Sequence, residues 1–164
     1  FMGCSTFSEY TVLAEISCAK VNPTIAPKFG CLFGCGVATG LGAVWNTAKV
    51  EPMSSVVVFG LGAVGLAVVQ GAKMIGAHPI VGIDTNPKKF ALATELGCTE
   101  CINPLDFPGK PFQQHLVATS PTGSGYDYAF DCTGNTDVRA AARARRRRGA
   151  QSRTRAFSAP HGSL

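Results

Sequence analysis

Two short apolar runs without polar alternation dominate the hydrophobic pattern of this chain, Ser55–Phe59 and Pro79–Ile83. Continuous runs of this kind are typical of strands buried on both faces of a parallel sheet. Ala63–Ile75, between them, has the length and composition of a helix. Apolar runs at Cys101–Ile102 and Tyr126–Phe130 predict two further strands. The alternation predicts an α/β fold with a partial Rossmann-type, doubly wound parallel sheet of four strands.

Three more helices are predicted, over Val37–Lys49, Lys88–Leu96 and Pro111–Thr119. Asn86 is a suitable N-cap for the second of them, and Pro87 suits its first helical position. A dinucleotide-binding sheet built from two halves has six strands, so the predicted sheet is incomplete.

The segment between the first predicted strand and its helix reads Gly-Leu-Gly-Ala-Val-Gly, with glycines in the pattern G-x-G-x-x-G. Gly60 permits a tight turn, Gly62 lets the backbone approach a pyrophosphate, and Gly65 lets the helix pack against the strand. The helix N-terminus then offers unpaired N–H groups and a positive dipole end to the phosphates. The segment therefore predicts a dinucleotide-binding loop.

Asp84 ends the second predicted strand, nineteen residues after Gly65. An acidic residue at this spacing accepts hydrogen bonds from the adenosine ribose hydroxyls and repels the 2′-phosphate of NADP. The pattern therefore favours NAD as the cofactor. The alternative is an ordinary α/β turn, in which the glycines serve packing and Asp84 only caps the next helix.

The net charge of +5 is unevenly distributed along the chain. Residues 1–138 carry seven lysines, no arginine and ten acidic residues, whereas residues 139–164 carry eight arginines and no acidic residue. We interpret residues 139–164 as an Arg-rich, disordered tail. Arg143–Arg148 is compatible with a nuclear-localisation or nucleic-acid patch but lacks interleaved aromatic residues. We favour a translated wrong reading frame or intron and do not expect nucleic acid as a partner.

Hydrophobic residues make up 46% of the chain, and no apolar run approaches membrane-spanning length. We expect a soluble, cytoplasmic protein without a membrane partner. Because the chain starts at Phe1 without a signal pattern, we expect a fragment of a longer protein. The odd number of cysteines, seven, favours free thiols in a reducing compartment. Cys98 and Cys101 form a C-x-x-C compatible with zinc or redox chemistry, but we favour incidental thiols.

Several sequence segments are specific in combination. They are Phe1-Met2-Gly3 with Ser5–Thr11, Gly34–Gly40, Asn46–Pro52, Gly97 with Thr99–Pro104, and Asp131–Asn135. Together these segments resemble the medium-chain, zinc-dependent alcohol dehydrogenases. Within that family the resemblance is to class III, the S-(hydroxymethyl)glutathione or glutathione-dependent formaldehyde dehydrogenases. It covers about residues 1–142.

The resemblance implies an enzyme that transfers a hydride from a zinc-bound alkoxide to C4 of NAD. Cys35 matches a catalytic zinc ligand, and no catalytic residue is assigned. Thr39 matches a threonine near the nicotinamide, and Lys89 a lysine beside the adenosine. The matched cofactor-binding positions are Thr39, Gly60, Leu61, Gly62, Ala63, Val64, Gly65, Asp84, Lys89 and Thr133. The resemblance also implies an alcohol or S-(hydroxymethyl)glutathione as substrate and a homodimeric parent enzyme.

Three parts of the chain are predicted. Residues 1–36 are a C-terminal remnant of the β-rich catalytic domain, with strand-like content at Phe7–Leu13, and residues 37–138 are an incomplete NAD-binding domain before the tail. We expect the isolated chain to be inactive, because one thiolate cannot hold a catalytic zinc. Two alternatives stay open, a non-catalytic nucleotide-binding remnant and a nucleic-acid-associating protein that binds through its tail.

Overall fold

The computed structural model describes residues 6–107 and 112–135. The chain divides into two compact units, Phe1–Cys31 and Leu32–Leu164. The Arg-rich tail, the end of the predicted NAD-binding domain at residues 136–138 and the predicted helix start at Pro111 lie outside the described residues.

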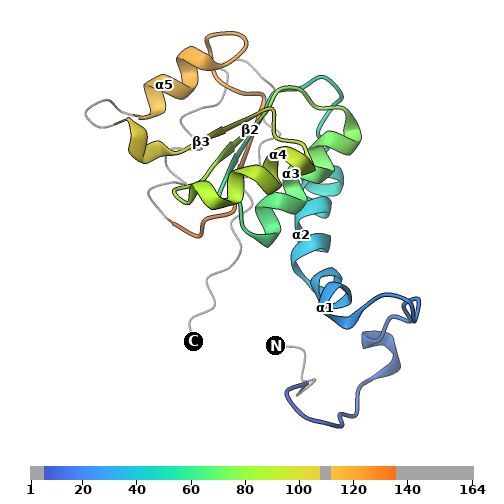
Figure 1. The fold of residues 1–164 in the computed structure, drawn as a ribbon. Helices are drawn as coiled ribbons and strands as arrows, with labels where there is room; N and C mark the ends of the chain where they lie inside the picture. The colour runs from blue at the N-terminus through green and yellow to red at the C-terminus, as the bar shows by residue number, and fades with distance from the viewer. Residues whose placement is uncertain (1–5, 108–111, 136–164) are drawn as a thin grey trace. The chain divides into compact units, whose positions relative to one another are not determined.

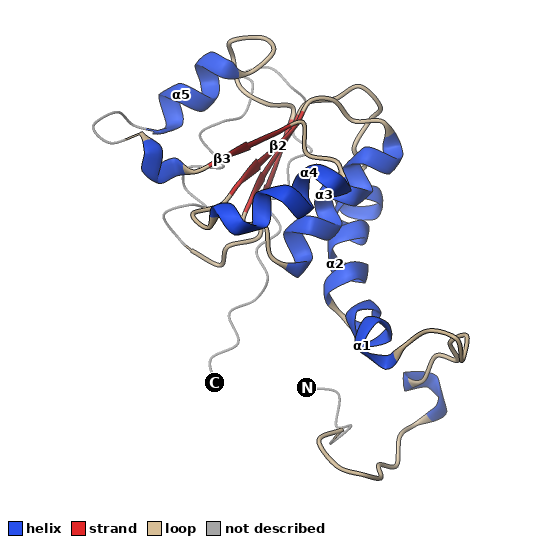
Figure 2. Cartoon of the chain, viewed as in Figure 1, coloured by secondary structure: helices blue, strands red, loops and turns tan. Residues whose placement is uncertain are grey.

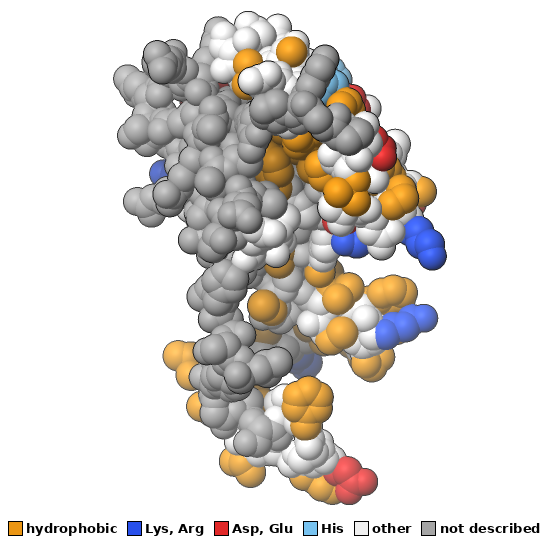
Figure 3. All heavy atoms as spheres, turned by 90° about the vertical axis from the view of Figure 1, so that its left-hand side faces the viewer, with side chains coloured by type: hydrophobic (Ala, Val, Ile, Leu, Met, Phe, Trp, Pro, Cys, Tyr) orange, Lys and Arg blue, Asp and Glu red, His pale blue; other side chains and the backbone are white. Residues whose placement is uncertain are grey.

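The N-terminal unit contains little regular structure (Figure 1). Its described residues form the 3-10 turn η1 (Glu15–Ser17) and the one-turn helix α1 (Pro27–Gly30). The strand expected at Phe7–Leu13 is wrong, because its described residues have no strand structure and side chains such as Phe7 are fully exposed. A strand needs a neighbour for its ladder hydrogen bonds, and the described part of this unit offers none. Such exposed hydrophobic side chains are visible on the molecular surface in Figure 3.

A four-stranded sheet forms the centre of the second unit (Figure 2). Its strands are β1 (Val56–Phe59), β2 (Ile80–Ile83), β3 (Glu100–Ile102) and β4 (Tyr128–Asp131). They lie in the order β3-β2-β1-β4, and every pairing is parallel. All residues of β1, β2 and β4 are buried, as their unbroken apolar patterns predict. The predicted four-stranded parallel α/β sheet is confirmed.

Helices cover both faces of this sheet (Figures 1 and 2). On one side lie α2 (Gly36–Gly42), α3 (Ala63–Ile75) and α4 (Phe90–Leu96), and α5 (Phe112–Thr119) lies on the other. The shorter elements are η2 (Cys31–Gly34), η3 (Ala43–Ala48), η4 (Pro87–Lys89) and η5 (Pro104–Asp106). The bounds of α3 are those predicted from the sequence.

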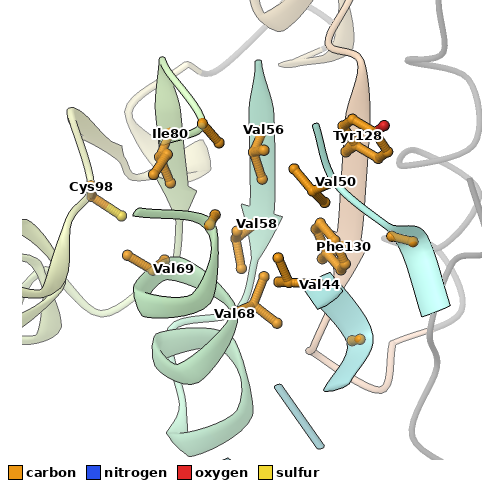
Figure 4. Close-up of a cluster of buried hydrophobic side chains, with 14 of the residues drawn as sticks. Val44, Val50, Val56, Val58, Val68, Val69, Ile80, Cys98, Tyr128 and Phe130 are labelled. Atoms are coloured by element: carbon orange, nitrogen blue, oxygen red, sulfur yellow. The ribbon is translucent and has the colours of Figure 1, made fainter. Parts of the chain in front are cut away.

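Two hydrophobic clusters hold the layers together. The cluster under α2, α3 and α4 contains Val56, Val58 and Phe130 from the sheet with Val68 and Val69 from α3 (Figure 4). The cluster on the opposite face consists of Val57, Phe59, Val81, Ile83, Ile102, Leu116, Tyr126 and Ala129. Alternate residues of β1 and β2 therefore contribute to opposite cores, which is why these two strands contain no polar residue.

Several elements differ in detail from their predicted form. The helix predicted over Lys88–Leu96 is the 3-10 turn η4 followed by α4. The helix predicted over Val37–Lys49 is α2 followed by the wider π-helical turn η3, which buries Val44 in the core. The strand predicted over Tyr126–Phe130 begins two residues later. The Asp127 carboxylate accepts hydrogen bonds from both the N–H and the hydroxyl of Ser55, so the ladder starts only at Tyr128.

Candidate functional site

The loop between β1 and α3 needs two of its three glycines for the fold itself. Gly60 has a left-handed φ of 87°, and its N–H donates to the carbonyl of Ile83 at 2.7 Å. A Cβ on Gly60 would lie 3.0 Å from the backbone of Cys132 and from Cγ2 of Thr133. A Cβ on Gly65 would overlap the carbonyl oxygen of Gly60. Both glycines are explained by close approach of backbone to backbone.

Gly62 has no such intramolecular reason to be glycine. No described atom lies within 4 Å of the position its Cβ would occupy, and its φ of −85° suits any residue. Gly62 is exposed and is the N-cap of the 13-residue helix α3, with no side chain capping that end. The first N–H groups of a helix have no partner within the helix, so open space at Gly62 leaves them accessible to an anion. An exposed helix N-terminus of this kind can bind a phosphate group.

The Asp84 carboxylate ties the end of β2 to the glycine loop. Its Oδ2 accepts from the Leu61 N–H at 2.8 Å and pairs with Nζ of Lys89 at 2.8 Å, and its Oδ1 accepts from the Asn86 N–H at 2.9 Å. Burial by itself would raise the pKa of Asp84. The hydrogen bonds from Lys89, Leu61 and Asn86, with the charge of Lys89, outweigh burial and lower that pKa. Asp84 is therefore an anion fixed at the loop.

The two interpretations of Asp84 are not exclusive. The bond to Asn86 is the local turn contact expected of an aspartate before a helix, and the Asn86 side chain in turn accepts from the Lys88 N–H. The bond to Leu61, 23 residues away in sequence, is not local. An ionised carboxylate has about four acceptor sites, and three are used here. In this pair the Lys89 side chain is 39% exposed, whereas the Asp84 side chain is 8% exposed.

Thr133 lies beside the glycine loop, just after β4. Its N–H and hydroxyl both donate to Oδ1 of Asp131, at 3.0 and 2.7 Å, and its hydroxyl oxygen accepts from the Asn135 N–H. The Cys132 N–H donates to the Phe59 carbonyl at 2.8 Å, which holds this turn against the end of β1. The carboxyl ends of β1, β2 and β4 thus bring Gly60, Asp84 and Thr133 to one edge of the sheet.

Close packing between α2 and α3 positions Cys35 and Thr39. A Cβ on Gly40 would lie 2.5 Å from Cβ of Ala67, and one on Gly36 would lie 3.4 Å from Cβ of Ala63. The backbones of the two helices therefore approach closely, with Gly36 beside the first residue of α3. Thr39 lies one turn into α2, and its N–H donates to the Cys35 carbonyl at 2.9 Å. The sequence analysis did not predict this packing. Its signal was the spacing of four residues between Gly36 and Gly40, which puts both glycines on one face of the helix.

Cys35 is the exposed N-cap residue of α2. Within residues 6–107 and 112–135, no group of three or more His, Cys, Asp or Glu side chains is placed to hold a metal ion. The described residues therefore do not form a zinc site. The other predicted positions, Ala63 and Val64, are the first residues of α3 and flank the open space at Gly62.

Comparison with known proteins decides the family. A family model described as zinc-binding dehydrogenase matches residues 63–152, more than half of the chain. The chain belongs to the zinc-binding dehydrogenase family. Among curated relatives, an S-(hydroxymethyl)glutathione dehydrogenase from Synechocystis is 59% identical over 138 residues, and one from Escherichia coli O1:K1 is 58% identical over 142 residues. The resemblance drawn from the sequence is confirmed.

The chain spans a little over a third of those relatives. It covers 37% of the Synechocystis protein and 38% of the E. coli protein, and these matches take up 84% and 87% of this chain.

Solved structures show the same fold. Benzyl alcohol dehydrogenase from Acinetobacter calcoaceticus has a TM-score of 0.68 and 31% identity, over 77% of this chain and 34% of that one. An alcohol dehydrogenase from Thermus sp. ATN1 has a TM-score of 0.70 and 25% identity, over 87% of this chain and 40% of that one.

No single helix in the described ranges is long and apolar enough to cross a membrane. The bent pair Pro27–Gly34 and Gly36–Ala48 meets the same criteria by length and composition only. The second member of that pair contacts α3 and buries Ala43, Val44 and Ala48, as the core helix of a globular domain does.

Proposed function

We propose that residues 37–138 are the NAD-binding part of a zinc-dependent alcohol dehydrogenase. The observation that carries this proposal is the contact between Asp84 and the glycine loop. An anionic carboxylate is held by the Leu61 N–H directly beside Gly62, where no described atom other than those of Gly62 and its two chain neighbours lies within 4 Å of a Cβ position. Packing alone explains Gly60 and Gly65, but it explains neither the open space nor an ionised group at its edge.

The geometry of this edge and the family resemblance support the proposed contacts. The pyrophosphate lies over Gly62 at the N-terminus of α3, where the N–H groups of Ala63 and Val64 are unpaired within the helix. The adenosine ribose hydroxyls donate to Asp84, with Lys89 beside them. The nicotinamide side lies toward Thr39, which the resemblance places near that ring. Thr133 matches a position whose backbone meets the cofactor in the family. NAD supplies the carbon that accepts a hydride, and the role of these residues is to bind and orient it.

We further propose that the whole enzyme acts on an alcohol, with S-(hydroxymethyl)glutathione as the favoured substrate. The support is the name of the relatives at 58–59% identity. In that enzyme Cys35 is one zinc ligand among several. The isolated 164-residue chain has one such ligand position, whereas catalytic zinc sites use three protein ligands. We therefore expect no turnover of S-(hydroxymethyl)glutathione by the purified chain, and NAD-dependent turnover free of contaminating enzyme would contradict this.

A second candidate is a nucleotide-binding module without catalytic activity. One contrast favours this candidate. The proposed NAD contacts lie together at the carboxyl ends of β1, β2 and β4, whereas Cys35 belongs to no group of three or more possible metal ligands in residues 6–107 and 112–135. Activity measured after mixing with a full-length family member separates this candidate from the first. The third candidate, a nucleic-acid-associating protein, rests on the tail alone, and salt-dependent binding to RNA or DNA tests it.

The test of the NAD proposal uses Asp84. Titration of the natural chain should show tighter binding of NAD than of NADP by at least about tenfold, or about 1.4 kcal/mol, because the carboxylate repels the 2′-phosphate. Asp84→Asn keeps the shape but removes the charge, so the preference should fall toward equality. Equal affinities in the natural chain, unchanged in the variant, would show that Asp84 does not contact the ribose.

A further inference from the structure

Cys98 and Cys101 lie against the same glycine of the sheet. Cys101 is the register partner of Gly82 in the neighbouring strand, and partners in adjacent parallel strands direct their side chains to the same face. A Cβ on Gly82 would lie 2.8 Å from the Sγ of Cys98. The missing side chain of Gly82 thus leaves the space that the Cys98 sulfur fills, next to the side chain of Cys101.

The two thiols differ in accessibility. Cys98 is 5% exposed, and its sulfur points into the cluster that contains Val69 and Ile80 (Figure 4). Burial, together with the neighbouring Cys101, raises the pKa of the Cys98 thiol to about 12. Cys101 is partly buried at the margin of the same cluster, in the strand at the edge of the described sheet. Cys101 is therefore the thiol that a reagent meets first, and Cys98 is the enclosed one.

We propose that Cys98 and Cys101 form a reversible intramolecular disulfide when the chain meets a small-molecule disulfide such as oxidised glutathione. The packing role favoured from the sequence explains one small apolar residue at each position. It does not explain two sulfurs brought together over a glycine. The disulfide would form next to the glycine loop between β1 and α3. Leu61 of that loop lies at the same place, since a Cβ on Gly82 would be 3.0 Å from its Cδ2.

The reaction proceeds by two thiol–disulfide exchanges. The Cys101 thiolate attacks one sulfur of oxidised glutathione, the glutathione S–S bond breaks, and one glutathione thiolate leaves. Cys98 then loses its proton to solvent and attacks the Cys101 sulfur, expelling the second glutathione thiolate. The two protein thiols lose two electrons, one glutathione disulfide is reduced, and the two glutathione thiolates take up the two protons.

Peptide mapping of the full chain tests this proposal. The reduced protein is incubated with oxidised glutathione, free thiols are alkylated, and the chain is cut after glutamate. Cleavage after Glu95 and Glu100 puts Cys98 on one peptide and Cys101 on a second peptide that also carries Cys132, so only a disulfide joins the two peptides. A joined pair that persists in Cys132→Ala identifies Cys101 as the partner. We expect the joined pair, released by reduction. The same treatment in urea should give a lower yield, because the native contacts at Gly82 are lost.

Variants make the result decisive. Cys98→Ala should abolish the joined pair and leave a glutathione adduct on Cys101, whereas Cys132→Ala, which removes another partly buried thiol, should leave the yield unchanged. The proposal is overturned by a stable glutathione adduct on Cys101 of the natural chain without a joined pair. It is equally overturned by complete alkylation of both cysteines, by pairing of Cys98 with another cysteine, or by an equal or higher yield in urea.

Discussion

Replacing single glycines of the loop by alanine separates the function of the loop from its folding. Gly62 and Gly65 are three residues apart, and the added methyl group is the same. At Gly62 it enters space where no described atom lies within 4 Å. At Gly65 it overlaps the Gly60 carbonyl oxygen. The account therefore predicts opposite consequences for stability and for cofactor binding.

The magnitudes follow from local structure. At Gly62 alanine is a poorer N-cap than glycine by about 0.5 kcal/mol, which lowers the free energy of unfolding. Alanine also restricts the unfolded chain, which raises the free energy of unfolding by about 0.4–1 kcal/mol. The free energy of unfolding of Gly62→Ala should stay within about 0.5 kcal/mol of the natural value. Gly65→Ala forces β1 and α3 apart, and overpacking of this kind costs about 1–3 kcal/mol.

Two measurements on the purified chain test the predicted changes in stability and in NAD affinity. Urea denaturation gives the free energy of unfolding, and titration with NAD gives the dissociation constant. Gly62→Ala should unfold like the natural chain but bind NAD at least about tenfold more weakly, because its methyl group occupies the proposed pyrophosphate position. Unchanged NAD affinity in a folded Gly62→Ala variant would refute the proposed position. A Gly65→Ala variant as stable as the natural chain would refute the packing argument.

Two further predictions concern stability. Since the pKa of Asp84 is lowered in the fold, its contribution is present above its unfolded value of 3.8 and is lost as pH falls through the lower folded value. Acid unfolding of Asp84→Asn should therefore depend less on pH below about 4 than that of the natural chain, and identical profiles would contradict this. Gly40→Ala should lower the free energy of unfolding by about 1–3 kcal/mol through its clash with Ala67, whereas Gly36→Ala, at 3.4 Å from Ala63, should cost less than about 1 kcal/mol. Equal losses in the two variants would show that α2 and α3 are not packed this closely.

The centre of the sheet was predictable because β1, β2 and β4 are buried along their whole length. The apolar runs that became β1 and β2 allow no other placement, and α3 has clear ends, with the glycine loop before it and the left-handed Gly76 after it. The prediction at Phe7–Leu13 failed because strand-forming residues do not make a strand without a neighbour, and the described part of that unit supplies none.

The sequence proposes the residues of the candidate site but not their contacts. The sequence identified Asp84 and the glycines by spacing, and Lys89 and Thr133 by resemblance. It did not show that the Leu61 N–H binds Asp84, that Asp131 orients Thr133, or that Gly40 packs on Ala67. These contacts join residues distant in the chain or depend on one rotamer, and neither is encoded in a local pattern.

The central claim is that NAD binds at the glycine loop, beside Asp84. The most direct test is to follow the backbone amide resonances of the 17.1 kDa chain by NMR during titration with NAD. The account predicts saturable shifts concentrated in residues 60–65 and around Asp84, with much smaller shifts in α5 on the opposite face of the sheet. Absence of saturable shifts, or shifts concentrated in α5, would contradict it.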